Sequence, residues 1–423
     1  MQLVAYGAQD IYLTGNPQIT FFKVVYRRHT NFAVESIEQT FNGQADFGKR
    51  VTATISRNGD LIQQMYLEVV TPEQGPGAWT YGFGNALIKQ AEIEIGGQLI
   101  DRQYGDWMNI WTELTVPAGK RQGYDNMVGN KIPSGEVGFD KNQTGTLNSG
   151  EVQRFYVPLQ FWFNRNPGLA LPLIALQYHE VKLNLELRTA NELKNLDDPV
   201  SSSGLNCKLY VDYVYLDTDE RRRFAQVSHE YLIEQVQFTG TETYTANSPS
   251  LNIPLNFNHP VKELVWVHVL TASVETNSAT GNRWFNYAGQ TSDTTKSRDS
   301  FTSALLQLNG HDRFSIRYAD YFRKVQNYEH HTRCPRVGNE LDFVDNRNQF
   351  IYSYSFALSP EEHQPSGTCN FSRIDNAILQ IKYGADESAG FLAQTGDMNL
   401  NIYAINYNVL RIMSGMGGLA YSN

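Results

Sequence analysis

Apolar and polar side chains alternate along many short segments of the chain. Residues 51–55, 65–70, 181–187 and 401–407 alternate with a period of about two, which is typical of strands with one buried face. In the N-terminal half this pattern predicts about eight strands, which cover residues 34–41, 50–56, 61–70, 87–95, 98–103, 152–159, 179–188 and 206–216. The first half of the chain is therefore predicted to be mostly β.

The pattern of the first half returns, in the same order, in the second half. Loops of different length make the spacing between matched segments vary. The matches are 37–39 with 233–235, 55–58 and 65–70 with 255–258 and 265–270, 93–97 with 306–310, 104–107 with 318–321, and 211–215 with 403–407. Because the matches are collinear and share one apolar alternation, we interpret the chain as two copies of one domain.

Turn and helix signals recur at matching places. The pairs 96–97 (Gly-Gly) and 309–310 (Asn-Gly) are predicted hairpin turns, because a type I′ turn needs positive φ at both central residues. Asp106 is the expected N-cap of a short helix with an apolar stripe of Trp107, Ile110, Trp111 and Leu114. Asp320 begins the corresponding helix, whose stripe contains Tyr321, Val325 and Tyr328 and is interrupted by Lys324.

These elements predict an all-β chain of two tandem antiparallel eight-stranded jelly rolls with long loops and short helices. Polar segments rich in Gly, Ser, Asn and Thr interrupt both copies. Segments of this length are usually functional or face a partner. They cover residues 115–150, 189–205, 272–300, 330–348 and 384–398.

Composition and charge exclude several classes of protein. The 423 residues carry a net charge of −9, and the longest basic run is 221–223, so direct nucleic-acid binding is not expected. Three cysteines (Cys207, Cys334 and Cys369) cannot all pair, which favours a reducing compartment. The first 13 residues lack a secretory-signal pattern, and no apolar run approaches the ~18 residues of a membrane span.

Four short motifs resemble reactive or ligand-binding sites, and each has a simpler explanation. Residues 82–84 (Gly-Phe-Gly) lack the third glycine of a dinucleotide loop and are expected to be a turn. His330, His331 and Cys334 lack a second ligand pair. Residues 361–363 (Glu-Glu-His) lie in a predicted turn, where charges are solvated, and 221–223 are expected to form salt bridges across a domain or subunit boundary.

No catalytic, cofactor-binding or metal-binding residue is therefore predicted, and no cofactor is expected. Two N-x-S/T sequons, at Asn142 and Asn370, are possible glycosylation sites if the chain meets a glycosylating enzyme. Asn142 lies in a long polar segment.

Long stretches of the sequence resemble the major capsid proteins of nucleocytoplasmic large DNA viruses. The similar stretches run from end to end and cover residues 2–23, 25–32, 55–61, 171–181, 365–375 and 408–423. The resemblance implies a double jelly roll with no catalytic residues. It also implies a homotrimeric, pseudo-hexagonal capsomer that tiles an icosahedral shell around an internal membrane, with assembly in the host cytoplasm.

The expected partners are neighbouring capsomers and minor capsid and penton proteins, with the inner membrane reached only indirectly. The expected domains are an arm (1–27), a first jelly roll (28–217), a linker (218–225), a second jelly roll (226–417) and a tail (418–423). The apolar arm is expected to dock under the shell, and segments 115–150 and 272–300 are expected to face outward. Aromatic segments 155–156 and 161–163 are candidates for contacts between lobes.

Two other classes of protein were weighed against a capsid protein. A bicupin enzyme also has two jelly rolls, but its metal site needs a His-x-His pair, which the nine histidines of this chain do not contain. A secreted glycan-binding or glycan-cleaving double sandwich is disfavoured by the missing signal and the odd number of cysteines.

Overall fold

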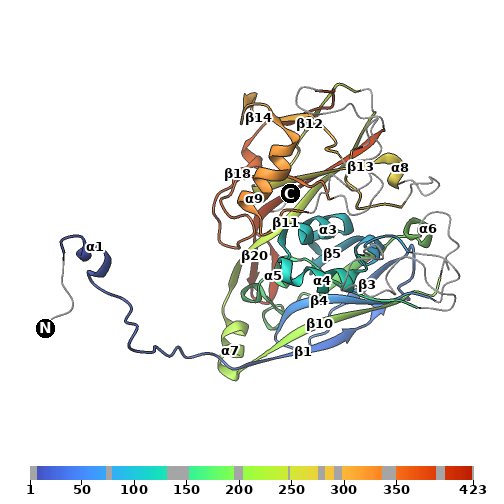
Figure 1. The fold of residues 1–423 in the computed structure, drawn as a ribbon. Helices are drawn as coiled ribbons and strands as arrows, with labels where there is room; N and C mark the ends of the chain where they lie inside the picture. The colour runs from blue at the N-terminus through green and yellow to red at the C-terminus, as the bar shows by residue number, and fades with distance from the viewer. Residues whose placement is uncertain are drawn as a thin grey trace.

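The structure is a computed structural model, and it describes residues 7–72, 79–130, 152–194, 203–245, 248–274, 282–289, 298–335, 349–386 and 396–421. The strands in these ranges form four antiparallel sheets, two from each half of the chain (Figure 1). We call the sheets of residues 32–216 the first roll and those of residues 229–419 the second roll.

The first roll consists of two sheets whose inward side chains share one core. One sheet has the order β1 (Phe32–Gln39), β10 (Asn206–Leu216), β4 (Leu61–Val70) and β7 (Arg154–Pro158), with β8 (Leu171–Pro172) also beside β4. The other has the order β2 (Phe41–Asn42), β3 (Arg50–Thr54), β9 (Val181–Leu187), β5 (Ile88–Ile95) and β6 (Gln98–Tyr104). The predicted strands of this half are confirmed with small changes at their ends.

The second roll repeats this plan. One sheet has the order β11 (His229–Tyr244), β20 (Met398–Met413), β13 (Pro260–Leu270) and β17 (Tyr352–Ser355), with β18 (Cys369–Asn370) on β13 and β21 (Met416–Leu419) on β20. The other has the order β12 (Ser250–Pro254), β19 (Ala377–Lys382), β14 (Ser303–Leu308) and β15 (His311–Asp312), with β16 (Arg317–Tyr318) also on β14.

Both rolls have the same strand order. The eight principal strands, in chain order, are β1, β3, β4, β5, β6, β7, β9 and β10 in the first roll and β11, β12, β13, β14, β15, β17, β19 and β20 in the second. In both rolls, one sheet contains the first, eighth, third and sixth of these strands, and the other contains the second, seventh, fourth and fifth. This is the order of an antiparallel jelly roll, in which long connections carry the chain between the two sheets. The predicted double jelly roll is confirmed.

The strand ladders confirm the internal repeat at most of the matched positions. Ile93 lies opposite Leu183 in the first roll, and Leu306 lies opposite Leu379 in the second. The turns agree as well, since residues 96–97 and 309–310 all have positive φ. The sequence match of 93–97 with 306–310 is therefore also a match in three dimensions.

The match of 37–39 with 233–235 is wrong in register. Ile37 lies opposite Val211, whereas Ile233 lies opposite Asn408, which is five residues beyond Tyr403, the residue matched to Val211 in the sequence. The ladders therefore place the counterpart of Ile37 several residues further along β11, near residues 237–238. The shared Ile-Glu-Gln string misleads because β11 has 16 residues and β1 only 8, so the string lies at different heights in the two strands.

Short helices fill the long connections between strands. The α-helices are α1 (Asp10–Thr14), α2 (Phe83–Leu87), α3 (Gly105–Thr115), α4 (Ala118–Val128), α5 (Trp162–Arg165), α6 (Ala190–Leu193), α7 (Thr218–Gln226), α8 (Thr271–Val274) and α9 (Gln326–His330). A π-helical turn, η4 (Tyr321–Val325), precedes α9, and 3₁₀ turns η2 (Pro167–Leu169), η3 (Leu173–Ala175) and η5 (Phe371–Arg373) complete the set.

Helix α3 confirms the predicted apolar stripe, since Trp107, Ile110 and Leu114 are fully buried. Its N-cap is Tyr104 rather than Asp106, which lies in the first helical turn, where a carboxylate favours the helix dipole. The stripe predicted for the second helix is wrong. In this helix the π-helical turn changes which side chains point to the core. Tyr328 is therefore 79% exposed, while Phe322, Gln326 and Asn327 are buried.

Two polar segments expected to be outward-facing loops contain packed structure. Residues 118–128 form α4, which buries Tyr124 and Val128 because the chain turns back onto the first roll. Within 272–300, Phe285 and Tyr287 are fully buried. Residues 131–151, and with them Asn142, lie outside the described residues.

Strand β20 differs from the expected half-buried strand, because residues 400–408 are buried on both faces. One face fills the second roll. The other contacts the first roll, where the Tyr403 ring packs 5.3 Å from that of Trp107. One hydrophobic cluster therefore continues through both rolls.

Candidate functional site

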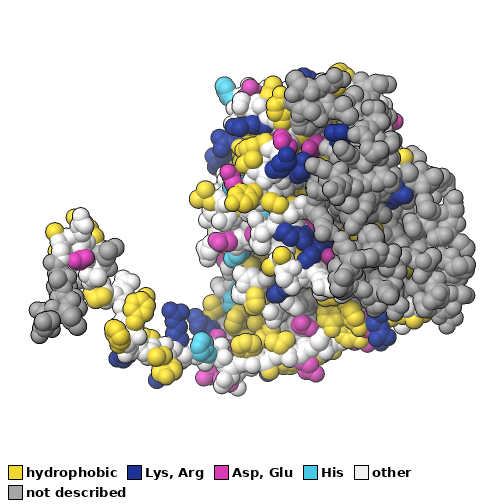
Figure 2. All heavy atoms as spheres, in the orientation of Figure 1, with side chains coloured by type: hydrophobic (Ala, Val, Ile, Leu, Met, Phe, Trp, Pro, Cys, Tyr) yellow, Lys and Arg dark blue, Asp and Glu magenta, His cyan; other side chains and the backbone are white. Residues whose placement is uncertain are grey.

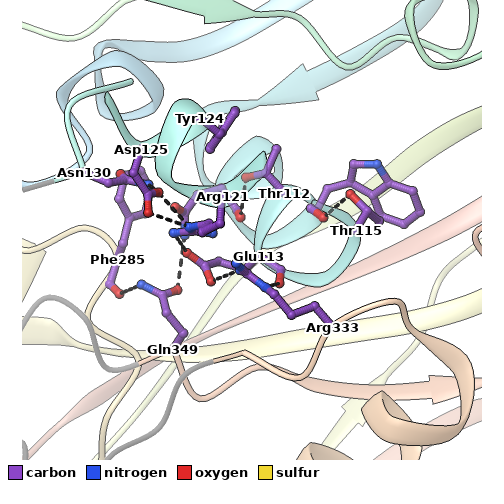
Figure 3. Close-up of polar contacts among 12 residues, drawn as sticks. Thr112, Glu113, Thr115, Arg121, Tyr124, Asp125, Asn130, Phe285, Arg333 and Gln349 are labelled. Atoms are coloured by element: carbon purple, nitrogen blue, oxygen red, sulfur yellow. Dashed lines mark hydrogen bonds and ion pairs between the residues drawn. The ribbon is translucent and has the colours of Figure 1, made fainter. Parts of the chain in front are cut away.

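A buried cluster of charges joins the two rolls (Figure 3). Glu113 on α3 pairs with Arg121 on α4 of the same roll and with Arg333, which follows α9 in the second roll. Arg333 Nε also donates to the Glu113 carbonyl at 2.8 Å. Asp125 completes the cluster at 2.7 Å from Arg121 Nε, and Asn130 Nδ2 donates to Asp125. Two guanidinium groups thus balance two carboxylates.

The two arginines of this cluster have opposite pKa shifts. Burial acts to lower the pKa of Arg121, but the charges of Glu113 and Asp125 outweigh it and raise the pKa. Burial also lowers the pKa of Arg333, and there the single adjacent carboxylate, already shared with Arg121, does not compensate. Both groups stay protonated because arginine begins from a very high pKa.

A neutral polar chain extends the contact beside these charges. Asn109 Nδ2 on α3 donates to Tyr287 Oη at 3.4 Å and to Gln349 Oε1 at 3.3 Å. Gln349 Nε2 donates in turn to the carbonyl of Phe285 at 3.1 Å. Buried polar groups that find partners in this way fix one relative orientation of the packed elements.

A second buried ion cluster lies between α5 and the second roll. Glu234 on β11 accepts from Arg165 Nη1 at 2.9 Å and lies 2.8 Å from Lys262 Nζ. The Lys262 side chain is 0% exposed, and burial lowers its pKa against the charge of Glu234. The Arg165 guanidinium also lies 4.7 Å from the centre of the Trp111 ring, a cation–π contact.

Residues 282–289 of the second roll pack against α6 of the first. Trp284 Nε1 donates to the Glu192 carbonyl at 2.8 Å, and the Arg188 guanidinium lies 3.9 Å over the Trp284 ring. Asn282 Nδ2 donates to the carbonyls of Asn191 and Lys194. This segment therefore holds the two rolls together.

The edge strands β6 and β11 meet at the joint and together line a groove of 620 Å³. Asp101 Oδ1 on β6 accepts from the Val236 backbone N–H at 3.2 Å. Gln235 Nε2 donates to the Ile100 carbonyl. Burial raises the pKa of Asp101 to about 6, opposed by hydrogen bonds from Gln103 and Val236.

His331, one of the sequence candidates for a metal ligand, is held between two carboxylates. Its Nε2 contacts Glu263, and its Nδ1 lies 2.9 Å from Glu361 Oε1. Burial would lower the pKa of His331, but the charge of Glu263 and hydrogen bonds to both carboxylates raise it to about 9. Hydrogen bonds from His331 and Thr332 outweigh burial and lower the pKa of Glu361.

The other sequence candidates are dispersed over the fold. Gly82, with φ of +66°, lies in a turn as predicted, but Phe83 and Gly84 belong to the buried helix α2, so the prediction that residues 82–84 form a turn is wrong for two of the three residues. Arg221 on α7 pairs with Asp60 at 3.0 Å, which ties this helix to the first roll. Glu361 is partly buried rather than solvated, because it binds His331. Cys334 is exposed, and Asn370 is exposed on β18.

Sequence reasoning missed the ion clusters of the joint. The partners that cross between the rolls, such as Glu113 and Arg333, are ordinary charged residues far apart in the chain. The available sequence signal for these crossing pairs was only a charge inside an apolar strand, such as Lys262. In the described ranges, no group of three or more His, Cys, Asp and Glu side chains is placed to hold a metal ion. Within the same ranges, no helix is long and apolar enough to cross a membrane.

Two family models match the chain almost end to end. Residues 20–217 match the N-terminal domain of major capsid proteins, and residues 220–418 match the large eukaryotic DNA virus major capsid protein. The major capsid protein of Pyramimonas orientalis virus is 53% identical over 100% of this chain and 99% of its own length. That of Paramecium bursaria Chlorella virus 1 is 46% identical with the same coverage.

Solved structures agree with these matches. A chain in the quasi-atomic model of the PBCV-1 virus capsid superposes with a TM-score of 0.75 at 41% identity, over 96% of this chain and 100% of that one. The Faustovirus major capsid protein shares the fold with a TM-score of 0.73 at 12% identity, over 96% of this chain and 94% of that one. The chain belongs to the family of major capsid proteins of large eukaryotic DNA viruses, which are structural proteins of the viral capsid.

Proposed function

We propose that this chain forms a homotrimer that serves as the pseudo-hexagonal capsomer of the icosahedral shell of a large double-stranded DNA virus. The observation that carries the proposal is the fixed pair of rolls with identical strand order. Three copies of such a pair give six similar lobes, and a six-lobed block packs like a hexagon. The buried ion clusters between the rolls support a rigid block rather than two independent domains.

The proposed partners follow from this role. Neighbouring capsomers would contact the sides of the block, and minor capsid proteins would contact it from beneath. Penton proteins are further proposed partners, and assembly would take place in the host cytoplasm. The inner membrane would be reached only through those proteins. A net charge of −9 supports a shell that does not contact nucleic acid directly. The proposed role requires no catalysis and no cofactor.

We also propose that the chain divides into an arm (1–27), a first roll (28–217), a linker (218–225), a second roll (226–417) and a tail (418–423). Helix α7 (Thr218–Gln226) supports the position of the linker, since it stands between the last strand of one roll and the first of the next. The tail follows β20, and most of its described residues lie in or beside β21.

Light scattering and electron microscopy of the purified full-length chain test the homotrimer. We expect a particle with the mass of three 48.0 kDa chains and a pseudo-hexagonal outline in projection. A stable particle with the mass of one chain at micromolar concentration would contradict the proposal.

A further inference from the structure

The joint within the chain is built from two edge strands, one from each roll. β6 ends one sheet of the first roll, and β11 ends one sheet of the second. The two strands meet directly, since Asp101 on β6 accepts from the Val236 backbone N–H on β11 and Gln235 on β11 donates to the Ile100 carbonyl. Ile100, Asp101 and Val236 are 2%, 3% and 7% exposed at this joint. The rings of Tyr104 and Phe238 pack across the joint with centres 5.2 Å apart.

Because the rolls share one strand order, each strand of this joint has a counterpart in the other roll. The counterpart of β11 is β1, since each is the first strand of its roll and pairs with the last strand of that roll, β20 and β10. The counterpart of β6 is the β15–β16 segment, residues 311–318. Tyr318 lies opposite Ser303 as Tyr104 lies opposite Gln90.

Both counterparts are uncovered in the single chain. Phe32, at the start of β1, is 66% exposed. Val34 is 49% exposed on the same strand. On the β15–β16 segment, Ile316 is 67% and Tyr318 is 46% exposed. The two strands that would complete a second joint therefore both present apolar side chains to solvent.

The two uncovered strands are also complementary in charge and placed for ring formation. β1 carries Glu35 and Glu38, of which Glu38 is already paired with Lys208 of its own sheet at 3.1 Å, whereas the β15–β16 segment carries Arg313 and Arg317 beside a single acid, Asp312. In Figure 1, β1 lies at the bottom of the molecule and β14, the partner of β15 and β16, lies at the top. Surfaces at opposite ends suit a head-to-tail contact that closes into a ring.

We infer that the contact between chains repeats the joint within the chain, so that β1 of one copy docks against the β15–β16 segment of the next copy. The occupant of each uncovered strand is thus a second copy of this protein. This inference rests on the proposed homotrimer and specifies which surfaces form it. The contact is heterologous, and three such contacts close the ring of six rolls.

Two variants that each block one side of the contact provide the test. Phe32→Asp replaces an exposed apolar side chain of β1 with a carboxylate, and Ile316→Asp does so on the β15–β16 segment. In each case docking would bury the new carboxylate and lose an apolar contact. Each full-length variant alone should sediment with the mass of one chain. Mixed at equal concentration, they should form a 1:1 dimer, because one intact β1 and one intact β15–β16 segment remain.

Two exposed residues outside both strands provide matched controls. Leu358→Asp and Tyr328→Asp replace side chains that are 77% and 79% exposed and should leave the trimer intact. Thermal unfolding checks the fold of each blocked variant, and Phe32→Ala with Ile316→Ala repeats the test at lower risk to folding. The alanine variants should raise the concentration needed for half-assembly at least tenfold.

The outcomes separate this inference from the homotrimer itself. If the unmodified chain is a trimer and either blocked variant remains one, the interface lies elsewhere and the inference is wrong while the homotrimer stands. Folded monomeric variants that fail to dimerise on mixing also contradict it, because a head-to-tail contact must survive between complementary variants. A monomeric unmodified chain overturns both proposals.

Discussion

The charged residues buried between the rolls stabilise the joint only as complete sets. Removing one partner of a buried ion pair leaves an uncompensated charge in a medium of low dielectric constant, which costs about 3–5 kcal/mol. An exposed pair of the same chemistry contributes about 0–1 kcal/mol, because water already solvates both groups. The chain contains pairs of both kinds, so the effect of burial can be measured within one protein.

Arg333→Met should therefore lower the free energy of unfolding by about 3–5 kcal/mol, since it leaves the buried Glu113 with one partner fewer. The matched control is Arg411→Met, because Arg411 pairs with Glu230 at 2.9 Å but the two side chains are 52% and 61% exposed. The control should change stability by less than about 1 kcal/mol. Denaturant unfolding measures both variants, and equal losses would show that the Arg333 pair does not depend on burial.

His331 predicts a pH dependence of stability. Its pKa is raised from 6.5 to about 9 in the folded chain, so the protonated ring stabilises the fold fully below pH 6.5. That contribution is on the order of 3 kcal/mol and is lost as the pH rises through 9. Melting curves of the unmodified chain and of His331→Gln should therefore differ most at pH 6 to 7 and converge towards pH 10. A difference that is constant across this range would contradict the double ion pair.

At the scale of single elements, the β5–β6 hairpin distinguishes two adjacent glycines. Both have positive φ, but a Cβ on Gly96 would collide with the His179 ring, whereas a Cβ on Gly97 meets nothing within 4 Å. The ring cannot easily move, because His179 Nδ1 lies 3.2 Å from the Gly417 backbone nitrogen in the second roll. Gly97→Ala should therefore cost about 1 kcal/mol from backbone strain alone.

Gly96→Ala should cost about 2–3 kcal/mol, because it adds the loss of the His179 contact to the same strain. Chemical unfolding of the two variants side by side makes the comparison. If both variants lose the same free energy of unfolding, the contact between His179 and Gly417 in the β20–β21 hairpin contributes nothing to stability.

The elements predicted best from the sequence were those governed by local physics. The strands of the first roll were placed to within about two residues because a half-buried strand needs an apolar residue at every second position. Helix α4 was missed because its sequence is polar and buries only a narrow face around Tyr124 and Val128. The burial of β20 was missed because its second face is covered by the other roll, which periodicity cannot reveal.

The sequence showed which charged residues the chain contains, but it did not show which of them pair with one another. The sequence shows Glu113 and Arg333 as two charges 220 positions apart, and only the packed rolls bring them together. The same limit applies to His331, whose doubly paired state depends on Glu263 from a strand and Glu361 from a turn. Candidate sites built from neighbouring residues were therefore dispersed, while the contacts that hold the joint went unpredicted.

At the scale of the whole molecule, two features set this chain apart from a compact pair of rolls. One is the pair of uncovered edge strands, which we have assigned to the next copy. The other is the arm, which leaves the body as an extended chain with the short helix α1 (Figure 1) and stands clear of the body in the space-filling view (Figure 2). Tyr12, Phe21 and Phe22 of the arm are 91%, 94% and 99% exposed. Apolar side chains in such numbers on an exposed segment indicate a partner that covers them.

Deleting residues 2–20 should leave soluble homotrimers intact but stop shell assembly. The arm adds little to the core of the rolls, since nearly all its described residues are exposed, and α1, with five residues, is too short to be a stable helix on its own. We therefore expect the partner of the arm to be either a minor capsid protein under the shell or the adjoining subunit.

A full-length variant separates the arm's apolar side chains from its length. Tyr12→Ser, Phe21→Ser and Phe22→Ser combined keep the arm but remove its three largest exposed rings, and this variant should fail in shell assembly as the deletion does. Light scattering follows the trimer, and electron microscopy of particles from cells expressing the virus proteins follows the shell. Both variants should melt within a few degrees of the unmodified chain. If the deleted trimers dissociate or misfold instead, the arm stabilises its own rolls, and its proposed role beneath the shell is wrong.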